Sequence, residues 1–460
     1  MDLAPHEIDE RIASAATDWR MAERALRKDA RASRRNVLEA HRAVTTRSMW
    51  IELGERSKDP ILAAARAWVY ALVLERVGWP ARVRAAEALH APSIEVPDLE
   101  PDRLSPRTVI DRLLTEPISD RRRFYADALA TGARHLRDAE FVLAERRAEA
   151  IRRLGVDDPD ALEVPLEPAT SLARLAERVL DVTAEFVPRA LQRWDDVIAF
   201  GLARGAGEGW PARLTLRWFT ELFAGTGLFD GLALPAFDPP RPLGASSFVR
   251  ALALFGRAYA ETDVPRSAPF VFKRSPFDLR VERRAALFGG LPADPLFGRR
   301  ALGLGRTRAV AQARDIAHAL VSTLRMDAVR VLMRGEVLSS ARARRERFEE
   351  LTDRAFGISF PSDVAFVLPR LGPSDPTRLL GTLLAMSDKQ SLVERFDEDW
   401  FRNPHAALAL RAEQAELPLA KASKDASLDA KPALLPFRTT DTEVDAALRD
   451  LERMLAALFG

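Results

Sequence analysis

The sequence predicts a mainly α-helical protein with one small β-hairpin. Apolar residues recur at three- and four-residue steps over most of the chain, which is the spacing of helices with one buried face. Glycine and proline gather in a few short stretches that divide these helices. Residues 270–283 instead show the two-residue alternation of a strand. With 460 residues, of which 47% are hydrophobic, the chain is long enough for a large core and for two to four lobes.

The first 170 residues are expected to form an N-terminal helical lobe. The pair Trp79-Pro80 should break one of its helices, because proline lacks the amide hydrogen that an α-helix needs. Prolines also predict extended connectors at 91–107 and 157–170. The predicted helices of this lobe cover residues 5–52, 108–114 and 120–154. Two more run from residue 60 to the break at Trp79-Pro80 and from that break to residue 90.

Residues 171–411 are expected to form a C-terminal lobe that carries the hairpin. Its longer strand holds Phe277, Leu279 and Val281, which alternate with charged residues, and Lys273 to Pro276 suits the turn. Residues 412–442 are polar without a clear period and predict a flexible linker, and 443–460 predict a closing helix. The other predicted helices are 171–204, 213–223, 248–259, 306–336, 337–356, 375–396 and 404–410.

The helix predicted over 306–336 carries the sequence Arg314-Asp315-Ile316-Ala317-His318. Zinc peptidases use H-E-x-x-H, in which two histidines on one helix face bind zinc and the glutamate activates the zinc-bound water. Arg314 stands at the first histidine position and Asp315 at the glutamate position, so His318 and a possible third ligand, Glu336, remain. An arginine side chain stays protonated and cannot bind a cation. We therefore expect no catalytic zinc, no other metal and no cofactor.

The order of these features resembles the M3 family of metallopeptidases, of the oligoendopeptidase F and thimet oligopeptidase type, over roughly residues 5–460. The predicted hairpin precedes the motif helix, as a small sheet does in that family, and residues 395–404 (RFDEDWFRNP) resemble the end of such proteins. The resemblance implies two helical lobes around a deep central channel. It also implies that a strand edge holds the substrate backbone, which assigns Phe277, Leu279 and Val281 to binding.

The resemblance places Arg314 and His318 at the two histidine positions, Asp315 at the base position and Glu336 at the third-ligand position. The M3 family also uses a late tyrosine to stabilise the oxyanion, whereas the three tyrosines of this chain all precede the motif helix. The missing ligand, base and oxyanion donor favour a pseudoenzyme that binds a peptide or protein segment in the channel. Arg314, Asp315, His318 and Glu336 would then form a polar cluster in place of the zinc.

Two other interpretations stay open. Asp315, His318 and Glu336 could together hold a metal, or His318 could act as a general base, in a hydrolase of altered chemistry. Alternatively, the chain is a helical interaction scaffold unrelated to peptidases. In that case Arg314 and Asp315 would face solvent and His318 would pack in a helix interface.

Composition excludes several classes of protein. The chain has no cysteine, so disulfides, thiol catalysis and cysteine-ligated metal sites are excluded. The 69 basic and 67 acidic residues nearly cancel, and acids are interleaved around the basic runs at 121–123 and 342–347, so we expect no nucleic-acid partner. No apolar run approaches the ~18–20 residues that span a bilayer, and the N-terminus lacks a signal-peptide pattern. We expect a cytoplasmic bacterial protein without a membrane partner.

Overall fold

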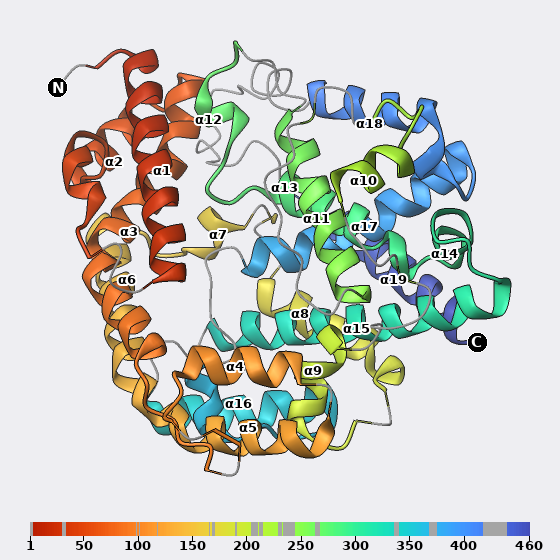
Figure 1. Ribbon diagram of the computed structural model, residues 1–460. Helices are drawn as coiled ribbons and strands as arrows, with labels where there is room; N and C mark the ends of the chain where they lie inside the picture. The colour runs from red at the N-terminus through yellow and green to blue at the C-terminus, as the bar shows by residue number, and fades with distance from the viewer. Residues whose placement is uncertain are drawn as a thin grey trace.

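The structure is almost entirely helical, as the sequence predicts (Figure 1). The computed structural model describes residues 3–460 apart from 30–33, 98, 101, 117, 165, 168–170, 189–190, 204–209, 211–214, 229–231, 233–243, 263–266, 335–339, 368–374 and 417–438. Within these residues, the β structure consists of two isolated bridges, Ile94 to Leu104 and Leu166 to Thr439. No helix in this part of the chain is both long and apolar enough to cross a membrane.

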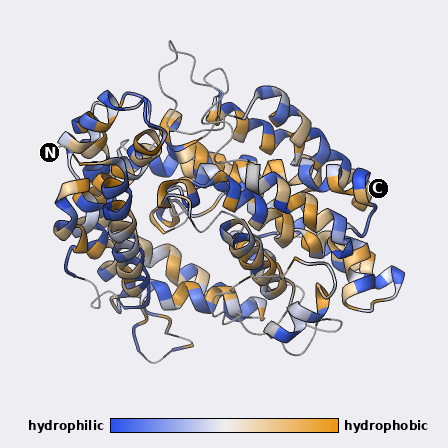
Figure 2. Cartoon of the chain, turned by 90° about the horizontal axis from the view of Figure 1, so that it is seen from above, coloured by the Kyte–Doolittle hydropathy of each residue, from blue (hydrophilic) through white to orange (hydrophobic). Residues whose placement is uncertain are grey.

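Many helices show both hydrophobic and hydrophilic stretches in the hydropathy colouring (Figure 2). The α-helices are α1 (Pro5–Lys28), α2 (Arg47–Glu55), α3 (Pro60–His90), α4 (Pro106–Thr115), α5 (Ser119–Gly132), α6 (Arg137–Leu154), α7 (Asp160–Glu163), α8 (Leu172–Val182), α9 (Trp194–Ala203), α10 (Leu216–Leu222), α11 (Ala245–Thr262), α12 (Phe270–Lys273), α13 (Leu279–Gly289), α14 (Pro295–Ala301), α15 (Arg306–Met333), α16 (Ala341–Phe356), α17 (Asp375–Phe396), α18 (Pro404–Glu416) and α19 (Asp441–Phe459). Short 3-10 helices are η1 (Val37–Val44), η2 (Ala133–Leu136), η3 (Ala184–Phe186), η4 (Leu291–Ala293), η6 (Ser362–Phe366) and η7 (Trp400–Arg402).

The helices α1, α2, α3 and α6 stand together at one side of the molecule and enclose a core of their own (Figure 1). Two aromatic residues of α3, Trp68 and Tyr70, are fully buried in this N-terminal core. Val271 and Phe277 also belong to it, although they come from a segment about two hundred positions later. The Nε1–H of Trp68 donates to the carbonyl oxygen of Arg274 at 2.8 Å, which fastens that later segment to α3.

Helix α3 continues through Pro80, so the predicted break at Trp79-Pro80 is wrong. A proline at position 80 cannot donate a hydrogen bond to the carbonyl oxygen of Arg76, four residues earlier. The side-chain amide of Asn36 donates to that oxygen at 2.9 Å instead. Because a side chain from another segment satisfies the carbonyl, the helix tolerates the proline.

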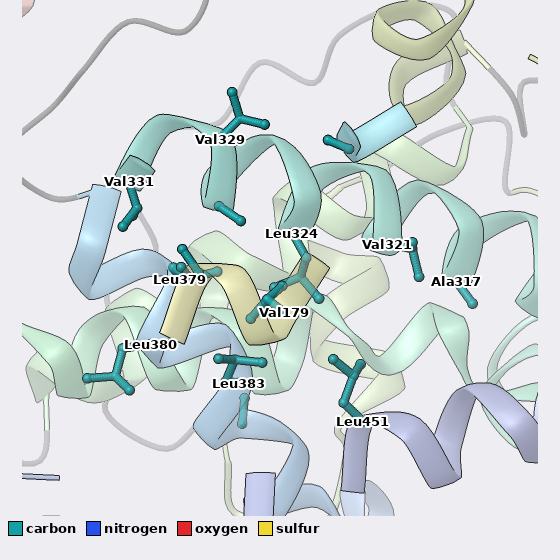
Figure 3. Close-up of a cluster of buried hydrophobic side chains, with 14 of the residues drawn as sticks. Val179, Ala317, Val321, Leu324, Val329, Val331, Leu379, Leu380, Leu383 and Leu451 are labelled. Atoms are coloured by element: carbon teal, nitrogen blue, oxygen red, sulfur yellow. The ribbon is translucent and has the colours of Figure 1, made fainter. Parts of the chain in front are cut away.

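The main core surrounds α15, which crosses the lower middle of the molecule (Figure 1). This helix packs against α8, α9, α14, α16, α17 and α19. Figure 3 shows part of the core, where Leu324 of α15 lies near Val179 of α8, with Leu383 of α17 and Leu451 of α19 close by. All four side chains are at most 1% exposed. Each such burial stabilises the fold by about 1.5–3 kcal/mol.

Arg325 ties α15 to the ends of two neighbouring helices. Its guanidinium donates to the carbonyl oxygens of Leu180 near the end of α8, and of Ala355 and Arg354 near the end of α16. The last carbonyls of a helix have no partner within the helix and carry partial negative charge, so they suit a buried cation. Burial and the nearby charge of Arg354 lower the pKa of Arg325 to about 10, which leaves it protonated at neutral pH.

The hairpin predicted at 270–283 does not form. Residues Phe270–Lys273 make the single turn α12, and α13 begins at Leu279. The carboxylate of Asp9 on α1 accepts the N–H groups of Phe270 and Val271 at 2.8 and 2.9 Å, and so caps α12 from outside. The side chain of Asp278 caps α13 by accepting the N–H of Val281 at 3.2 Å. Asp278, whose charge fitted the alternation of the predicted strand, is therefore the N-cap of a helix.

Most of the predicted linker falls on residues 417–438, which lie outside the described residues, between α18 and α19. The predicted closing helix corresponds to α19. Of the predicted linker 412–442, residues 412–416 belong to α18 and residues 441–442 to α19, while Thr439 forms the bridge to Leu166 and Thr440 is the N-cap of α19. Helix α19 thus confirms the predicted closing helix, which starts two residues earlier than expected. The division into two lobes around a channel stays a prediction.

Candidate functional site

The three motif residues line a pocket along the first half of α15. Its volume is about 630 Å³. Seven of its eight lining residues come from α15, and the eighth is Phe459 at the end of α19. The seven form two adjoining rows along the helix, and the members of each row are four positions apart. The lining residues are Arg306, Thr307, Val310, Ala311, Arg314, Asp315, His318 and Phe459.

Arg314 is exposed and is held by the end of α19. Its Nε–H donates to the carbonyl oxygen of Leu458 at 2.6 Å. That carbonyl lies in the last turn of α19, where an α-helix has no internal donor for it. This bond fixes the guanidinium at the edge of the pocket. Within the described part of the chain, neither Arg314 nor Arg306 forms an ion pair with a carboxylate.

His318 is half-buried between α15, η3 and α19. Its Nδ1 lies 3.2 Å from the carbonyl oxygen of Phe186, and its ring lies 4.2 Å, centroid to centroid, from that of Phe459. Because a carbonyl only accepts, the Nδ1 carries the hydrogen in this contact. The rings of Phe186 and Phe459 also lie 5.8 Å apart, so His318 belongs to an aromatic cluster. These are the contacts of a packed helix-interface residue.

Asp315 is exposed at the edge of the same pocket, one position after Arg314. Glu336, the predicted third ligand, lies outside the described residues. Among the residues that are described, no group of three or more histidine, aspartate or glutamate side chains could hold a metal ion. Asp315 and His318 therefore supply two donor groups, and the neighbouring position holds the cation Arg314.

The predicted strand-edge residues lie elsewhere and do not line the pocket. Phe277 is 4% exposed in the N-terminal core, with its ring 6.1 Å from that of Tyr70. Leu279 and Val281 are half-buried in the first turn of α13. The predicted strand edge made of these three residues is wrong, because Phe277 lies in the turn between α12 and α13, and Leu279 and Val281 lie in α13.

An arginine-rich stretch of the chain supplies part of the pocket lining, and sequence reasoning missed it. Five exposed arginines lie on α14 and the first half of α15: Arg299, Arg300, Arg306, Arg308 and Arg314. Residues 295–314 contain these five arginines and no aspartate or glutamate, in a chain whose total charges nearly cancel. That local imbalance was the signal in the sequence. Two of the five, Arg306 and Arg314, line the pocket, and we call these two residues the basic rim.

Comparison with known proteins assigns no family to the chain. No protein-family model matches the sequence, and no curated protein matches it significantly. The chemistry of the pocket is therefore the guide to function.

Proposed function

We propose that this protein binds a peptide or protein segment without metal and without cleaving it, as a catalytically inactive relative of the M3 metallopeptidases. The supporting observation is the pocket on α15, which the degenerate motif lines. At the first histidine position of that motif, the pocket presents Arg314, which is bonded to the carbonyl of Leu458. A permanent cation at this position opposes metal binding and suits a polar or anionic ligand.

The lining of the pocket suits a peptide better than a small polar metabolite. Val310, Ala311 and Phe459 offer an apolar surface, and the charged groups lie beside it. A volume of about 630 Å³ is in the range of ligand-binding pockets. Since the predicted strand edge is absent, recognition would rest on side-chain contacts and not on main-chain pairing with a strand.

A helical interaction scaffold without peptidase ancestry is the second candidate function. Arg314 and Asp315 are exposed, and His318 packs against Phe459, as that interpretation expects. The scaffold would bind its partner over a broad surface and would not depend on the pocket. Filling the pocket with a side chain therefore separates the two candidates.

Ala311→Trp tests the proposal, because Ala311 is exposed and lines the pocket, so a large side chain there fills the space without entering the core. A random peptide library would be displayed against wild type and variant in the presence of a chelator. We expect peptides selected on wild type to bind Ala311→Trp at least about tenfold more weakly, a loss of ~1.4 kcal/mol.

Thr323→Trp is the matched control. Thr323 is exposed on α15 but does not line the pocket, so this variant should bind the selected peptides as wild type does. Equal binding by Ala311→Trp would contradict the pocket as the site and favour the scaffold. Mass spectrometry of the selected peptides after incubation checks the chemistry, and a cleaved peptide would favour the altered hydrolase.

A further inference from the structure

We infer that the pocket on α15 selects acidic segments, so that its ligand carries carboxylates next to an apolar side chain. This inference rests on the proposed peptide binding and names the chemistry of the ligand at the same pocket. It is carried by the basic rim, by the fixed guanidinium of Arg314 and by the apolar lining.

Arg306 and Arg314, which form the basic rim, make no ion pair with a carboxylate of the described residues. Some exposed arginines elsewhere pair with a glutamate four positions along their helix, as Arg217 does with Glu221 and Arg342 with Glu346, both at 2.7 Å. Arg306 and Arg314 have no acidic residue three or four positions away on α15. A concave surface lined by unneutralised cations attracts anions and raises their local concentration.

The bond from Arg314 to Leu458 prepares its guanidinium for a carboxylate. The Nε–H is used by the carbonyl of Leu458, which fixes the plane of the group. The two terminal nitrogens can then donate in parallel to the two oxygens of one carboxylate, and less side-chain freedom is lost on binding. Arg306 lies two turns earlier on the same lining and can take a second carboxylate.

The remaining lining sets the position of the apolar side chain of the ligand. Val310, Ala311 and Phe459 lie beside the two arginines, so an apolar residue next to a carboxylate reaches both surfaces. The N-cap of α15 is Gly305, which has no side chain to bond the first N–H groups of the helix, and their partial charge adds to the attraction. Asp315 stands in the adjoining row of the lining and repels a carboxylate, so the acidic groups bind along the row that holds Arg306 and Arg314.

The same cations could meet the phosphates of a nucleic acid, but the pocket favours a peptide. Nucleic-acid grooves combine extended positive charge with many phosphate contacts. Here the cations border an apolar pocket that also contains Asp315, and the chain as a whole carries a net charge of +2. An acidic peptide can use the apolar surface, which a phosphate backbone cannot.

Two bead-bound peptide libraries test the inference. One is random over glutamate, aspartate, phenylalanine, leucine, valine, glycine and serine, and the second replaces the two acids by glutamine and asparagine. Labelled protein should bind at least about tenfold more beads of the acidic library. The double variant Arg306→Gln/Arg314→Gln should lose this preference, while Arg217→Gln/Arg342→Gln, which removes two exposed arginines outside the pocket, should keep it. Circular dichroism melting confirms that both variants fold.

The outcomes separate the inference from the proposed function. Equal binding of the acidic and amide libraries would overturn the inference and leave peptide binding in place. Binding of neither library would overturn both. A preference that survives Arg306→Gln/Arg314→Gln would show that other cations recognise the acids. A duplex DNA oligonucleotide that displaces the acidic beads at physiological salt would identify nucleic acid as the ligand and overturn the inference.

Discussion

Glu163 is a fully buried carboxylate that joins four helical segments. It accepts hydrogen bonds from the hydroxyl of Tyr70 at 2.8 Å, from Arg147 at 2.8 Å and from Arg334 at 2.9 Å. Burial would raise its pKa, but the charges of Arg147 and Arg334 outweigh this and hold the pKa below its ordinary value. Burial and the charge of Glu163 together raise the pKa of Tyr70. One ionised side chain therefore connects α3, α6 and α7 to the end of α15.

We predict that Glu163→Gln lowers the free energy of unfolding by about 3 kcal/mol, because it leaves buried Arg147 without a counter-ion and Arg334 with Asp160 alone. Urea unfolding at pH 7 measures this change. Glu149→Gln is the control, because Glu149 pairs with Arg146 and Arg153 near the surface. That variant should lose less than about 1 kcal/mol. Similar losses in the two variants would contradict the role assigned to Glu163.

The same residue sets an acid limit on stability. The stabilisation from ionised Glu163 is fully present above the pKa of an unfolded glutamate, about 4.3, and is lost as the pH falls through its lower folded-state pKa. Wild type should therefore lose stability below about pH 4 more steeply than Glu163→Gln. Parallel curves of unfolding free energy against pH would show that other carboxylates cause the acid unfolding.

At the scale of elements, glycines allow α13 to lie very close to its neighbours. A Cβ atom at Gly256 of α11 would lie 2.2 Å from the carbonyl oxygen of Arg284, which is main-chain and cannot move aside alone. On the other side, a Cβ at Gly381 of α17 would lie 2.9 Å from the main-chain nitrogen of Arg283. Helix α13 is thus held between two glycine contacts, and α15 packs in turn against α17.

We predict that Gly256→Ala destabilises the protein by about 3 kcal/mol, because α11 and α13 must separate to admit the methyl group. Gly78→Ala is the matched control within α3. A Cβ there would meet only Leu143 at an ordinary 3.7 Å, and alanine favours a helix over glycine by about 1 kcal/mol, so this variant should be neutral or more stable. Thermal unfolding of the two variants compares them directly. A stable Gly256→Ala protein would contradict the close packing.

At the scale of the whole molecule, ion pairs neutralise much of the charge. The two arginines of the basic rim differ, because neither pairs with a carboxylate of the described residues. Many arginines pair with aspartate or glutamate, as Arg378 does with Asp327 and Arg283 with Asp388. The positive charge beside the pocket is thus local, although the chain is nearly neutral overall. Such an arrangement directs an anionic ligand to one place.

We predict that neither zinc nor a chelator changes the unfolding temperature of the whole protein by more than about 1 °C. A ligand that binds only the folded state stabilises it by ~2.7 kcal/mol at one hundred times its dissociation constant, which would raise the temperature by several degrees. Asp315 and His318 offer too few donors for such binding. A clear rise with zinc that His318→Ala removes would contradict the proposed metal-free function and support the altered hydrolase.

The helical fold and the position of the motif followed from local patterns. The long helix predicted over 306–336 is α15, which ends at Met333. Local patterns were wrong at Pro80 and at 270–283. In both places a side chain from a distant segment, Asn36 or Asp9, bonds the main chain and supports a helix that local sequence opposed.

The sequence was sufficient to place Arg314, Asp315 and His318 along one helix and to show that they do not make an H-E-x-x-H motif, because both depend on residue type and helical spacing. The pocket itself depended on tertiary packing, since Phe459 and the carbonyl of Leu458 reach α15 from about 140 residues away. The same packing decided that His318 stacks on Phe459 and that Phe277 is buried. Helical spacing is a local property of the chain, whereas the surface that covers a helix comes from segments whose approach no local pattern encodes.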